Sequence, residues 1–579
     1  MNASQVTQAA LSSAIPIIIG VTGHQDLRAE DIPELERQVQ KIFEKLRAQY
    51  TDTTLLALSP LAEGADRLVA RIALQQGAQL VVPLPLPRSE YERDFHTPES
   101  RAEFNELLQQ AQYFELPLMA DNTAENIRDC GPCRDKQYAQ VGAYIVRHSQ
   151  ILFALWDGVD TGLEGGTAQI VRFKLEGIPE PYAPPRNPLD VVDAGPVYHI
   201  LTPRVKNPLP AGEPFSLDIK FPGSDAEAES QRDDYTQILG RMNTFNRDVR
   251  CLSSRLGEQI KKNKEYLIPE TQAARLPETA RTIFEQYAVA DTLAIHFQGW
   301  RRRMLITLFA IAMLAVISFE VYAHLLNKPW VLVLYPVALG SAFLLYRWAK
   351  RQDYQNKHLD YRALAEGLRV QLFWHLSGLP DEAADHYLRK QRTELEWIRN
   401  AIRAWSVLAA PTCTVAQDWG WLLKEVVLEH WAEHQHRYFN SATDRDHKKL
   451  ARHEDTANGF FVFGLLLAIA VVFLHSTFHD SSAYSYWHHW LIVIMGTAPA
   501  IAAAMGGYAE KMAFSAQAKR YHWMSALFKR ASEQLRALLN EQKSSEAQRL
   551  ILDLGKEALE ENGDWVIIHR ERTLEVPKG

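Results

Sequence analysis

The strongest constraint on this chain is a set of four uncharged apolar runs in its C-terminal half. They occupy residues 304–319, 329–346, 456–474 and 490–509. A helix needs about 20 apolar residues to cross the hydrocarbon of a bilayer. Core helices of a large globular protein are the alternative, but the runs form two pairs flanked by Trp, Tyr and Arg, as membrane spans do. The sequence predicts four transmembrane helices in two hairpins, at 304–325, 329–347, 457–475 and 489–509.

Basic residues collect at one end of every predicted span. These residues are Arg301, Arg302, Arg303, Arg347, Lys350, Arg351, Arg445, Lys448, Lys449, Arg452, Lys511, Lys519 and Arg520. The two turns at the other end hold a single basic residue, Lys328. Because positive residues stay on the cytoplasmic side, both termini are predicted to be cytoplasmic.

The overall composition excludes some classes of protein. The chain of 579 residues is too long for one core, and its 63 Lys and Arg against 70 Asp and Glu give a net charge of −7. A protein that binds nucleic acid needs a basic face, so we expect no nucleic-acid partner. Four cysteines make no disulfide framework and indicate a reducing compartment. The first 30 residues lack the charged and apolar regions of a cleaved signal peptide.

The N-terminal third alternates apolar strand-like runs with amphipathic helical runs. Strands covered on both faces read as continuous apolar runs, which favours a parallel sheet. We therefore predict an α/β Rossmann-like domain at 1–205. Residues 206–300 are predicted to be a linker followed by an amphipathic helical connector, and the remainder an all-α membrane domain.

The connector contains a heptad-like apolar seam. Its members are Tyr235, Ile238, Met242, Phe245, Val249, Leu252 and Leu256. Spacings of three and four residues place them on one helix face. That face fits either self-association or packing on the chain's own domain.

The membrane half contains a weak internal repeat. The second and fourth spans begin 160 residues apart, as do Tyr361 and Tyr521 in the helices that leave the membrane. We therefore predict a first hairpin unit at 301–440 and a second at 441–579. Four helices leave no room for a sizeable pore within one chain, so a conduit would require a homo-oligomer.

Three turns of the α/β region combine glycine with polar residues. They are Gly20–Gly23, Ala62–Asp66 and Gly165–Thr167. At the carboxyl ends of parallel strands, glycine lets backbone N–H groups approach an anion, and the following helix adds its positive end. Thr22 and Thr167 can donate hydroxyls, and Asp66 or Asp157 can accept from a ribose. Although such turns also serve as ordinary punctuation between strand and helix, three together favour a phosphorylated nucleotide. Neither a P-loop nor a G-x-G-x-x-G motif is present.

The stretches "IIIGVTGHQDL", "SPLAEGADRLVARIALQQGAQLVVPLPLPRSEYERDF" and "ILFALWDGVDTGLEGGTAQIV" resemble the SLOG superfamily of Rossmann-like domains. The resemblance covers about residues 15–205. It implies a bound nucleotide-derived signal, such as a cyclic nucleotide or an ADP-ribose derivative, and no further cofactor. The implied ligand-binding residues are Gly20, Thr22, Gly23, His24, Glu63, Gly64, Asp66, Arg67, Asp157, Gly158, Gly165, Gly166 and Thr167.

The third turn departs from the hydrolase branch of that superfamily. Gln169 stands where those enzymes carry a catalytic glutamate, and an amide cannot act as a general acid or base. Glu164, before the turn, is a possible substitute. We expect binding without turnover, and a membrane-tethered phosphoribohydrolase is the alternative.

The membrane half is similar to the SLATT modules of bacterial conflict systems, through Tyr361, Arg362, Glu366 and "WVIIHRERTLE" at 565–575. The resemblance implies a nucleotide-activated effector of antiviral defence in the bacterial inner membrane. Its partners would be a messenger-synthesising enzyme, the lipid bilayer and further copies of the chain. A nucleotide-regulated ion channel outside defence is a second alternative; sparse charge inside the spans argues against a transporter.

Four further features have weaker readings. Cys130 and Cys133 form a C-x-x-C pair, which fits redox or metal chemistry only at a suitable helix start. A second feature is a group of outer-turn histidines, His475, His479, His488 and His489. They fit a zinc site or, more simply, solvent-exposed histidines of a loop. Glu320 is an ionisable group at membrane depth. Pro499 fits a hinge in the fourth span, whose small residues favour close packing.

Overall fold

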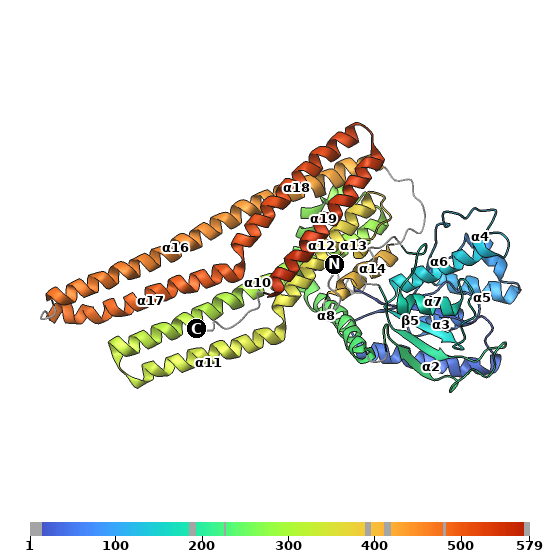
Figure 1. Cartoon of the computed structure of the whole chain (residues 1–579), viewed down its shortest axis with the longest axis horizontal. Coiled ribbons are helices and arrows are strands. Elements are labelled where there is room, and N and C mark those ends of the chain that lie inside the picture. The colour runs from blue at the N-terminus through green and yellow to red at the C-terminus, as the bar shows by residue number, and fades with distance from the viewer. Residues whose placement is uncertain are drawn as a thin grey trace.

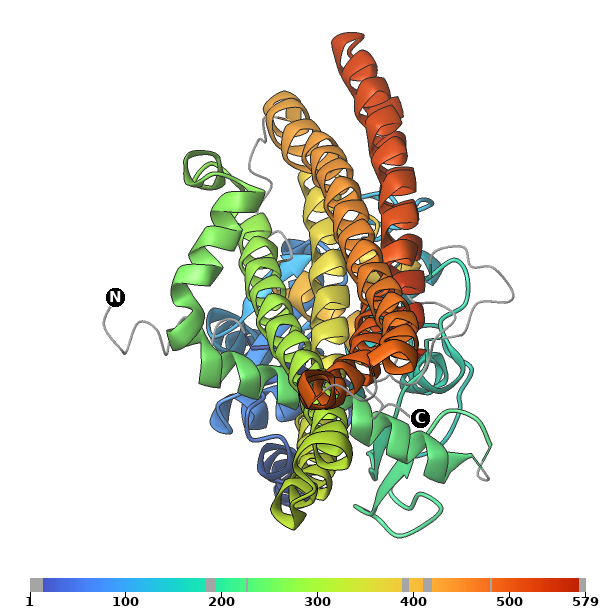
Figure 2. The same cartoon turned by 90° about the vertical axis from the view of Figure 1, so that its left-hand side faces the viewer.

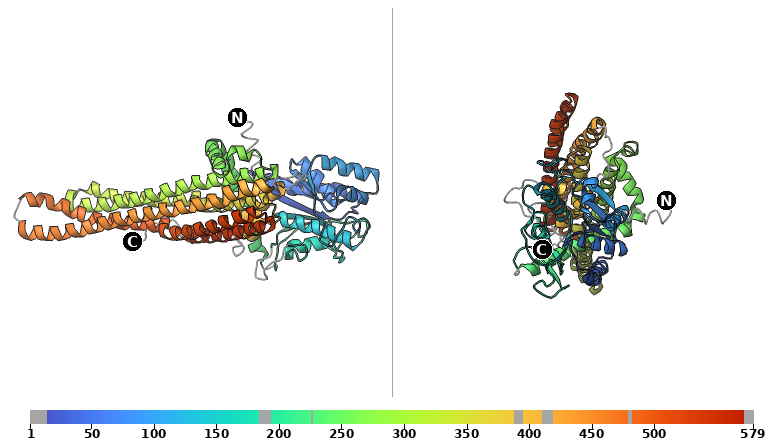
Figure 3. Two further views of the ribbon diagram at one scale, coloured as in Figure 1. Left: turned by 90° about the horizontal axis from the view of Figure 1, so that it is seen from above. Right: turned by 90° about the vertical axis from the view of Figure 1, so that its right-hand side faces the viewer.

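The computed structural model describes residues 14–183, 193–224, 227–387, 395–409, 419–478 and 482–571. The molecule is elongated, with the α/β domain at one end and two long helical hairpins at the other (Figures 1 and 3). A bundle of helices lies between them. The first helix of each hairpin continues into this bundle without a break.

The N-terminal domain is built on a seven-stranded sheet. Its strands are β1 (Ile17–Gly23), β2 (Leu55–Leu58), β3 (Gln79–Leu84), β4 (Gln112–Glu115), β5 (Ile151–Trp156), β6 (Val197–Leu201) and β7 (Leu217–Lys220). The order is β4-β3-β2-β1-β5-β6-β7, and all neighbours are parallel except β6 and β7. β5 is buried along its whole length, as expected of a central parallel strand. The predicted Rossmann-like fold class is confirmed.

Helices cover both faces of this sheet (Figure 1). They are α2 (Ile32–Gln49), α3 (Ala65–Gln75), α5 (Pro98–Gln109), α6 (Pro132–His148) and α7 (Thr167–Glu176). In α2 the buried residues are Leu35, Val39, Ile42, Phe43 and Leu46, spaced as one helix face requires. Short turns of helix are η1 (Ala29–Asp31), α4 (Arg88–Tyr91), η2 (Glu92–Asp94), α9 (Glu270–Ala273), α13 (Ala383–His386) and α15 (Trp419–Trp421).

The sequence analysis missed β7, which lies within the predicted linker. β7 has only four residues, and its Leu217 is 39% exposed. An antiparallel edge strand with one solvated face carries little apolar signal. The prediction of a plain linker between 206 and 229 was therefore wrong at this point.

The heptad-like seam packs inside the chain. It lies on α8 (Ala228–Leu267), where Ile238, Met242, Phe245 and Val249 are buried. The Phe245 ring contacts three aromatic rings of the bundle, with centroid distances of 5.1 to 6.1 Å. Of the two readings of the seam, packing on the chain's own domain accounts for these buried residues.

The helical half consists of long helices. They are α10 (Glu278–Val321), η3 (Tyr322–Leu326), α11 (Pro329–Gln352), α12 (Tyr354–Leu376), α14 (Glu396–Leu408), η4 (Leu422–Glu433), α16 (His434–Phe478), α17 (Ser482–Met512), α18 (Phe514–Asn540) and α19 (Ser544–Glu571). Among the residues that the structure describes, four helical segments are long and apolar enough to cross a membrane. The hairpins α10–α11 and α16–α17 run side by side, with α10 against α17 (Figures 1 and 2). The predicted unit boundaries after residues 300 and 440 fall inside α10 and α16, which pass through them unbroken.

The two hairpin units share one backbone break. Asp353 separates α11 from α12 and Ala513 separates α17 from α18, and these two positions are 160 residues apart. Both residues adopt the left-handed conformation, with φ of 54° and 57°, which is uncommon without glycine. Ala338 and Ala498, also 160 apart, are both buried. The structure thus supports the internal repeat by geometry as well as by hydrophobicity.

One close crossing in the bundle joins α12 to α19. The Trp374 indole N–H donates to the Ile551 carbonyl at 3.2 Å, over the surface of Gly555. A Cβ at Gly555 would lie 2.2 Å from the indole nitrogen. Glycine is required here because two helix backbones approach with a tryptophan ring between them.

We expect Gly555→Ala to destabilise the chain by about 2 kcal/mol, because the added methyl overpacks this crossing. The matched control is Gly257→Ala on the exposed side of α8, where a Cβ meets nothing within 4 Å. That change should stabilise by about 0.5–1 kcal/mol through helix propensity. Thermal unfolding of both variants in detergent, followed by tryptophan fluorescence, measures the change in melting temperature of each. Equal changes in the two variants would contradict the close packing at Gly555.

Candidate functional site

The candidate site lies where the sheet reverses its winding. From β1 the strands β2, β3 and β4 extend to one side, and β5, β6 and β7 extend to the other. Gly23, at the end of β1, pairs with Leu155 near the end of β5. In open α/β sheets, ligands bind outside the carboxyl ends of the strands at this reversal. The turns that follow β1, β2 and β5 all open on this edge.

Glycines let the first two turns touch each other. A Cβ at Gly23 would lie 2.4 Å from the Ala65 Cβ, and one at Gly64 would lie 2.5 Å from the His24 carbonyl oxygen. Gly64 also has φ of +78°, which disfavours other residues. The Ala65 N–H donates to the His24 carbonyl at 3.0 Å. These contacts fix the start of α3 against the end of β1.

Gly20 has a different role from the other glycines of the turns. A Cβ at Gly20 would lie 2.7 Å from the Ile145 side chain and 2.8 Å from the Ser149 hydroxyl. Both neighbours are at the end of α6 or directly after it. Gly20 therefore permits close packing of α6 on β1. Thr22, two residues later, is buried.

Asp157, directly after β5, is the centre of a polar cluster. Its Oδ1 lies 3.0 Å from the His24 Nε2 and accepts from the Val159 N–H at 3.1 Å. Its Oδ2 accepts from the Arg204 Nε at 2.9 Å and the Asn207 Nδ2 at 3.1 Å. Burial alone would raise the pKa of Asp157, but these hydrogen bonds outweigh it and lower the pKa to about 2. Asp157 is thus an organising carboxylate that links three loops.

Burial also lowers the pKa of His24, which keeps this ring neutral near neutral pH. Arg204 and Asn207 were missed by the sequence analysis. They follow β6, the next parallel strand, so the same strand-end rule that selected Asp157 would have found them. They add a cation and an amide to the candidate edge.

The second turn is held by buried polar contacts. Arg67 is 2% exposed; its Nε donates to the Leu61 carbonyl at 3.0 Å and its Nη1 contacts Glu103 at 3.1 Å. Glu63 accepts from the Ser100 hydroxyl. Asp66 is buried, and burial raises its pKa to about 8. Asp66 and Arg67 therefore stabilise the turn from inside rather than facing solvent.

The third turn is built around Gln169. Its Oε1 accepts the Gly165 N–H at 2.7 Å, so the amide that replaces the hydrolase glutamate fastens the turn to α7. Glu164 accepts from the Tyr182 hydroxyl. Gly166 caps α7, whose first residue is the half-buried Thr167. Since α7 follows β5, its positive N-terminus opens on the same edge as Asp157.

Gly165 packs against the other end of α6. A Cβ there would lie 2.8 Å from the Tyr138 Cβ and 3.0 Å from the Asp135 carbonyl oxygen. Gly165 and Gly158 have φ of +74° and +82°, so both positions favour glycine. The third turn is therefore in contact with the first turns of α6.

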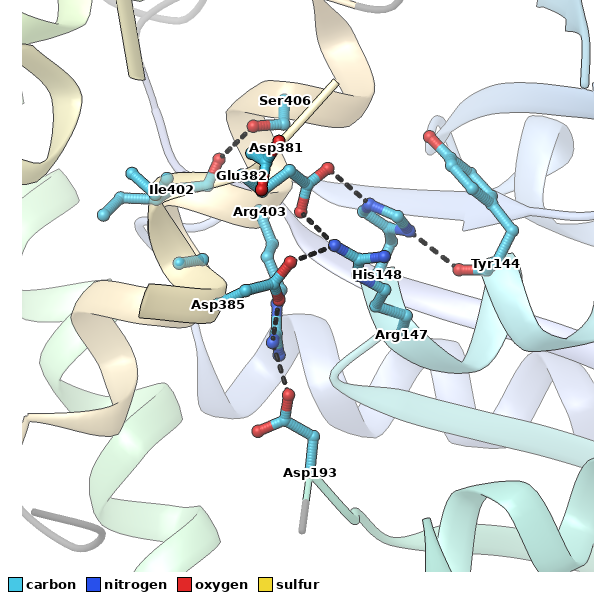
Figure 4. A network of polar contacts seen from close by, with 12 residues as sticks. Tyr144, Arg147, His148, Asp193, Asp381, Glu382, Asp385, Ile402, Arg403 and Ser406 are labelled. Carbon is cyan, nitrogen blue, oxygen red and sulfur yellow. Dashed lines mark hydrogen bonds and ion pairs between the residues drawn. The ribbon is translucent and has the colours of Figure 1, made fainter. Parts of the chain in front are cut away.

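The opposite edge of the sheet docks on the helical bundle through buried charges (Figure 4). Arg147 and His148, in the last turn of α6, meet Glu382 and Asp385 beside and within α13. The His148 Nε2 lies 3.0 Å from Glu382, and Arg147 pairs with Asp385. Arg403 of α14 bridges Asp385, at 3.0 Å, and Asp193. We call this group of charged residues the dock.

Further contacts between the α/β domain and the bundle lie beside the dock, on α8 and α14. The Asn246 side chain accepts the Ile15 N–H at 2.8 Å and donates to the Ile15 carbonyl at 2.9 Å. Arg399 contacts Asp193 at 2.8 Å. Contacts at Ile15, which precedes β1, and after α6 place the bundle at the amino edge of the sheet. The candidate ligand edge faces away from the bundle.

The two membrane candidates lie at helix contacts. A Cβ at Gly496 would lie 2.9 Å from the Glu320 carboxyl carbon, so Glu320 of α10 rests on α17. Glu320 also contacts His324 at 3.7 Å. Pro499 packs on Gly464 of α16, where a Cβ would come within 3.0 Å of the ring. Both residues therefore help to position α17.

The remaining candidates form no metal site within the described ranges, where no group of three ligating side chains gathers. Cys130 and Cys133 are free thiols. The rings of His475 and His488 stack at 5.3 Å, and His489 lies 5.8 Å from His488. His479 lies outside the described residues.

The cavities in the described part of the chain include four of about 280 to 570 Å³. None of these four is lined by a residue of the three turns. The candidate edge is therefore a surface built by backbone and helix ends rather than one of these chambers.

No protein-family model matches this chain, and a search of curated proteins gave no match. The fold itself defines a class: a Rossmann-like α/β domain joined to a helical module with four candidate membrane spans.

We expect the buried Asp66 carboxyl to make stability depend on pH. Its pKa rises from 3.8 to about 8 on folding, so the folded chain holds a proton that the unfolded chain releases. The resulting stabilisation is fully present below pH 3.8 and is lost as pH rises from there to 8, by about 1.4 kcal/mol per pH unit. Asp66→Asn should flatten this slope in denaturant unfolding between pH 5 and 8.5. The control is Asp160→Asn, which changes an exposed carboxylate in the loop after β5 and should keep the slope. An unchanged slope in Asp66→Asn would refute the assignment of this pH dependence to Asp66.

Proposed function

We propose that this chain is a membrane effector activated by a nucleotide second messenger. One observation carries the proposal: the glycine turns open on one edge of the sheet, and the opposite edge is docked by buried charges onto α13 and α14 of the helical bundle, from which the candidate membrane spans extend. A sensor and an output element are thus held in one molecule. The order of the two elements along the long axis fits signalling from ligand to membrane.

The ligand we propose is a phosphorylated nucleotide, either a cyclic nucleotide or an ADP-ribose derivative. The N-termini of α3 and α7 supply backbone N–H groups and partial positive charge for a phosphate. Arg204, held by Asp157, adds guanidinium N–H donors at the same edge. The Thr167 hydroxyl, in the first turn of α7, is a further donor.

Helix α6 is the proposed link between ligand and spans. Its 17 residues extend about 25 Å. Its first turns contact Gly165 of the third turn, and its last turn carries Arg147 and His148 of the dock. A ligand that repositions the third turn therefore acts on α6, and through α6 on α13 and α14. It shifts the equilibrium only if it favours one arrangement over the other.

The proposed output is membrane permeabilisation by a homo-oligomer, because four spans per chain enclose no sizeable pore. The SLOG and SLATT resemblances support placing it in bacterial antiviral defence, with an enzyme that makes the messenger as partner. The basic ends of the spans support an inner-membrane location with cytoplasmic termini.

Gly166→Trp is expected to abolish messenger binding, because the ring covers the cap of α7. We would screen cyclic nucleotides and ADP-ribose derivatives by thermal shift, and then measure dye leakage from liposomes that contain the protein. The wild type should bind one ligand class and release dye only in its presence. Gly257→Trp, on the exposed side of α8, is the control and should behave as the wild type.

Other outcomes of these assays favour the alternatives. Consumption of the nucleotide would indicate the tethered phosphoribohydrolase, and ion flux without ligand would indicate a channel. Binding unchanged in Gly166→Trp would place the ligand elsewhere.

Asp385→Asn should separate binding from output. The change removes a carboxylate that contacts both Arg147 and Arg403 across the dock. We expect the messenger affinity to stay within about twofold and leakage to fall at least tenfold, since loss of one partner from a buried ionic group is strongly destabilising to the contact. Asp381→Asn, whose partner is the nearby His386, is the matched control and should leak normally. Equal leakage from both variants would contradict coupling through the dock.

A further inference from the structure

A cavity of about 570 Å³ lies between the two hairpins at the basic end of the spans. It is formed by α10 of the first hairpin, α16 and α17 of the second, and the start of α18. Its lining separates into a basic end and an apolar wall. The nucleotide edge of the sheet is not part of it, so a ligand of this cavity is independent of the proposed messenger.

The basic end contains Arg302, Lys449 and His453. Arg302 and Lys449 are exposed, and Lys449 has one carboxylate partner, Asp446, at 3.0 Å. The His453 ring lies between two aromatic rings, Tyr508 at 5.5 Å and Phe514 at 5.7 Å. Its Nδ1 is buried and has no hydrogen-bond partner within the residues that the structure describes. Two cations thus lie at one opening, beside the His453 ring.

The apolar wall runs from this end along the spans. On α10 it consists of Ile306, Ala310 and Met313, and on α17 of Ile501 and Ala504. From Arg302 to Met313 the groove follows α10 for about 16 Å, the rise of eleven helical residues. Ile306 is 46% exposed, so the wall has no protein cover along this side.

We propose that this groove binds an anionic glycerophospholipid. A negatively charged phosphate group fits the cations at the basic end, and an acyl chain fits the apolar wall beyond it. Basic pockets between membrane helices on the cytoplasmic side recognise such head groups. A soluble phosphate would satisfy the cations but would leave the apolar wall exposed, so the shape selects a lipid.

The bound lipid contacts both hairpin units at once. At this level the two units are joined by the contact of α10 with α17, where the Phe309 and Tyr508 rings meet at 6.3 Å. A lipid between Arg302 and Lys449 adds a charged bridge from α10 to α16. Its occupancy therefore tunes how firmly the hairpins are held together.

The test is native mass spectrometry of the delipidated full-length chain in detergent, titrated with phosphatidylglycerol or with phosphatidylcholine of the same acyl chains. We expect one phosphatidylglycerol to bind at least about tenfold more tightly, since each basic side chain near an anionic group contributes about a factor of five. The double change Arg302→Gln and Lys449→Gln should remove this preference. Glycerol 3-phosphate, which lacks acyl chains, should not displace the lipid.

Two controls separate the groove from general surface charge. Arg303→Gln with Lys448→Gln removes the same charge from neighbouring residues that do not line the groove, and it should keep the preference. Ala504→Trp fills the apolar wall without any change of charge and should block the lipid, whereas Ala503→Trp on the exposed side should not. Size-exclusion profiles check that the tryptophan variants fold.

Three results would overturn the proposal. They are equal binding of the two lipids, equal loss of binding in the two double variants, and full binding by a folded Ala504→Trp. Displacement by glycerol 3-phosphate would assign the basic end to a soluble phosphate instead.

Discussion

The buried ionic dock between α6 and the α13–α14 segment is the interaction on which this architecture depends. Arg147, His148 and Arg403 would be costly to bury alone, because desolvation of a charge must be offset by well-placed partners. Glu382, Asp385 and Asp193 supply those partners from separate segments (Figure 4). The network tolerates little displacement, since moving one group leaves another charge buried and unpaired. A contact of this kind holds two domains in one defined arrangement or releases them.

The long helices are the elements through which a movement at the dock can reach the candidate spans. The dock helix α14 packs against α10, and α10 passes from the bundle into a candidate span without a break. α16 is likewise unbroken between the bundle and its candidate span. The repeated break before α12 and α18, at Asp353 and Ala513, turns the chain back into the bundle in both units. The two units therefore meet the α/β domain through one continuous helical body. The lipid groove sits at the level where that body enters the membrane.

The candidate ligand edge illustrates how one residue type serves two purposes. Glycine was selected from the sequence for its ability to admit a phosphate, and Gly166 and Gly158 remain open to that use. Gly20, Gly23 and Gly64 also have a packing reason, because side chains there would collide with α6, with Ala65 or with the His24 carbonyl. Gln169 likewise has a local task, since it accepts the Gly165 N–H. The chemistry of the edge therefore depends on Asp157, Arg204 and the start of α7 as much as on glycine.

The sequence by itself determined the four candidate membrane spans, the parallel α/β pattern and the internal repeat. These are periodic or compositional properties, carried by neighbouring residues: uncharged runs, buried strands, and Tyr361 matched by Tyr521. It also placed the three turns on one edge, because parallel strands share a direction. Only the tertiary structure decided that Arg204 and Asn207 complete the Asp157 cluster, that the α8 seam packs inward, and that Arg147 meets Asp385. The side-chain contacts of Asp157 with Arg204 and of Arg147 with Asp385 join residues 47 and 238 positions apart. The hydrophobic pattern of β7 is too weak for the strand to be predicted from the sequence. Long-range pairing depends on how the helices and strands pack in three dimensions, and local periodicity contains no record of that.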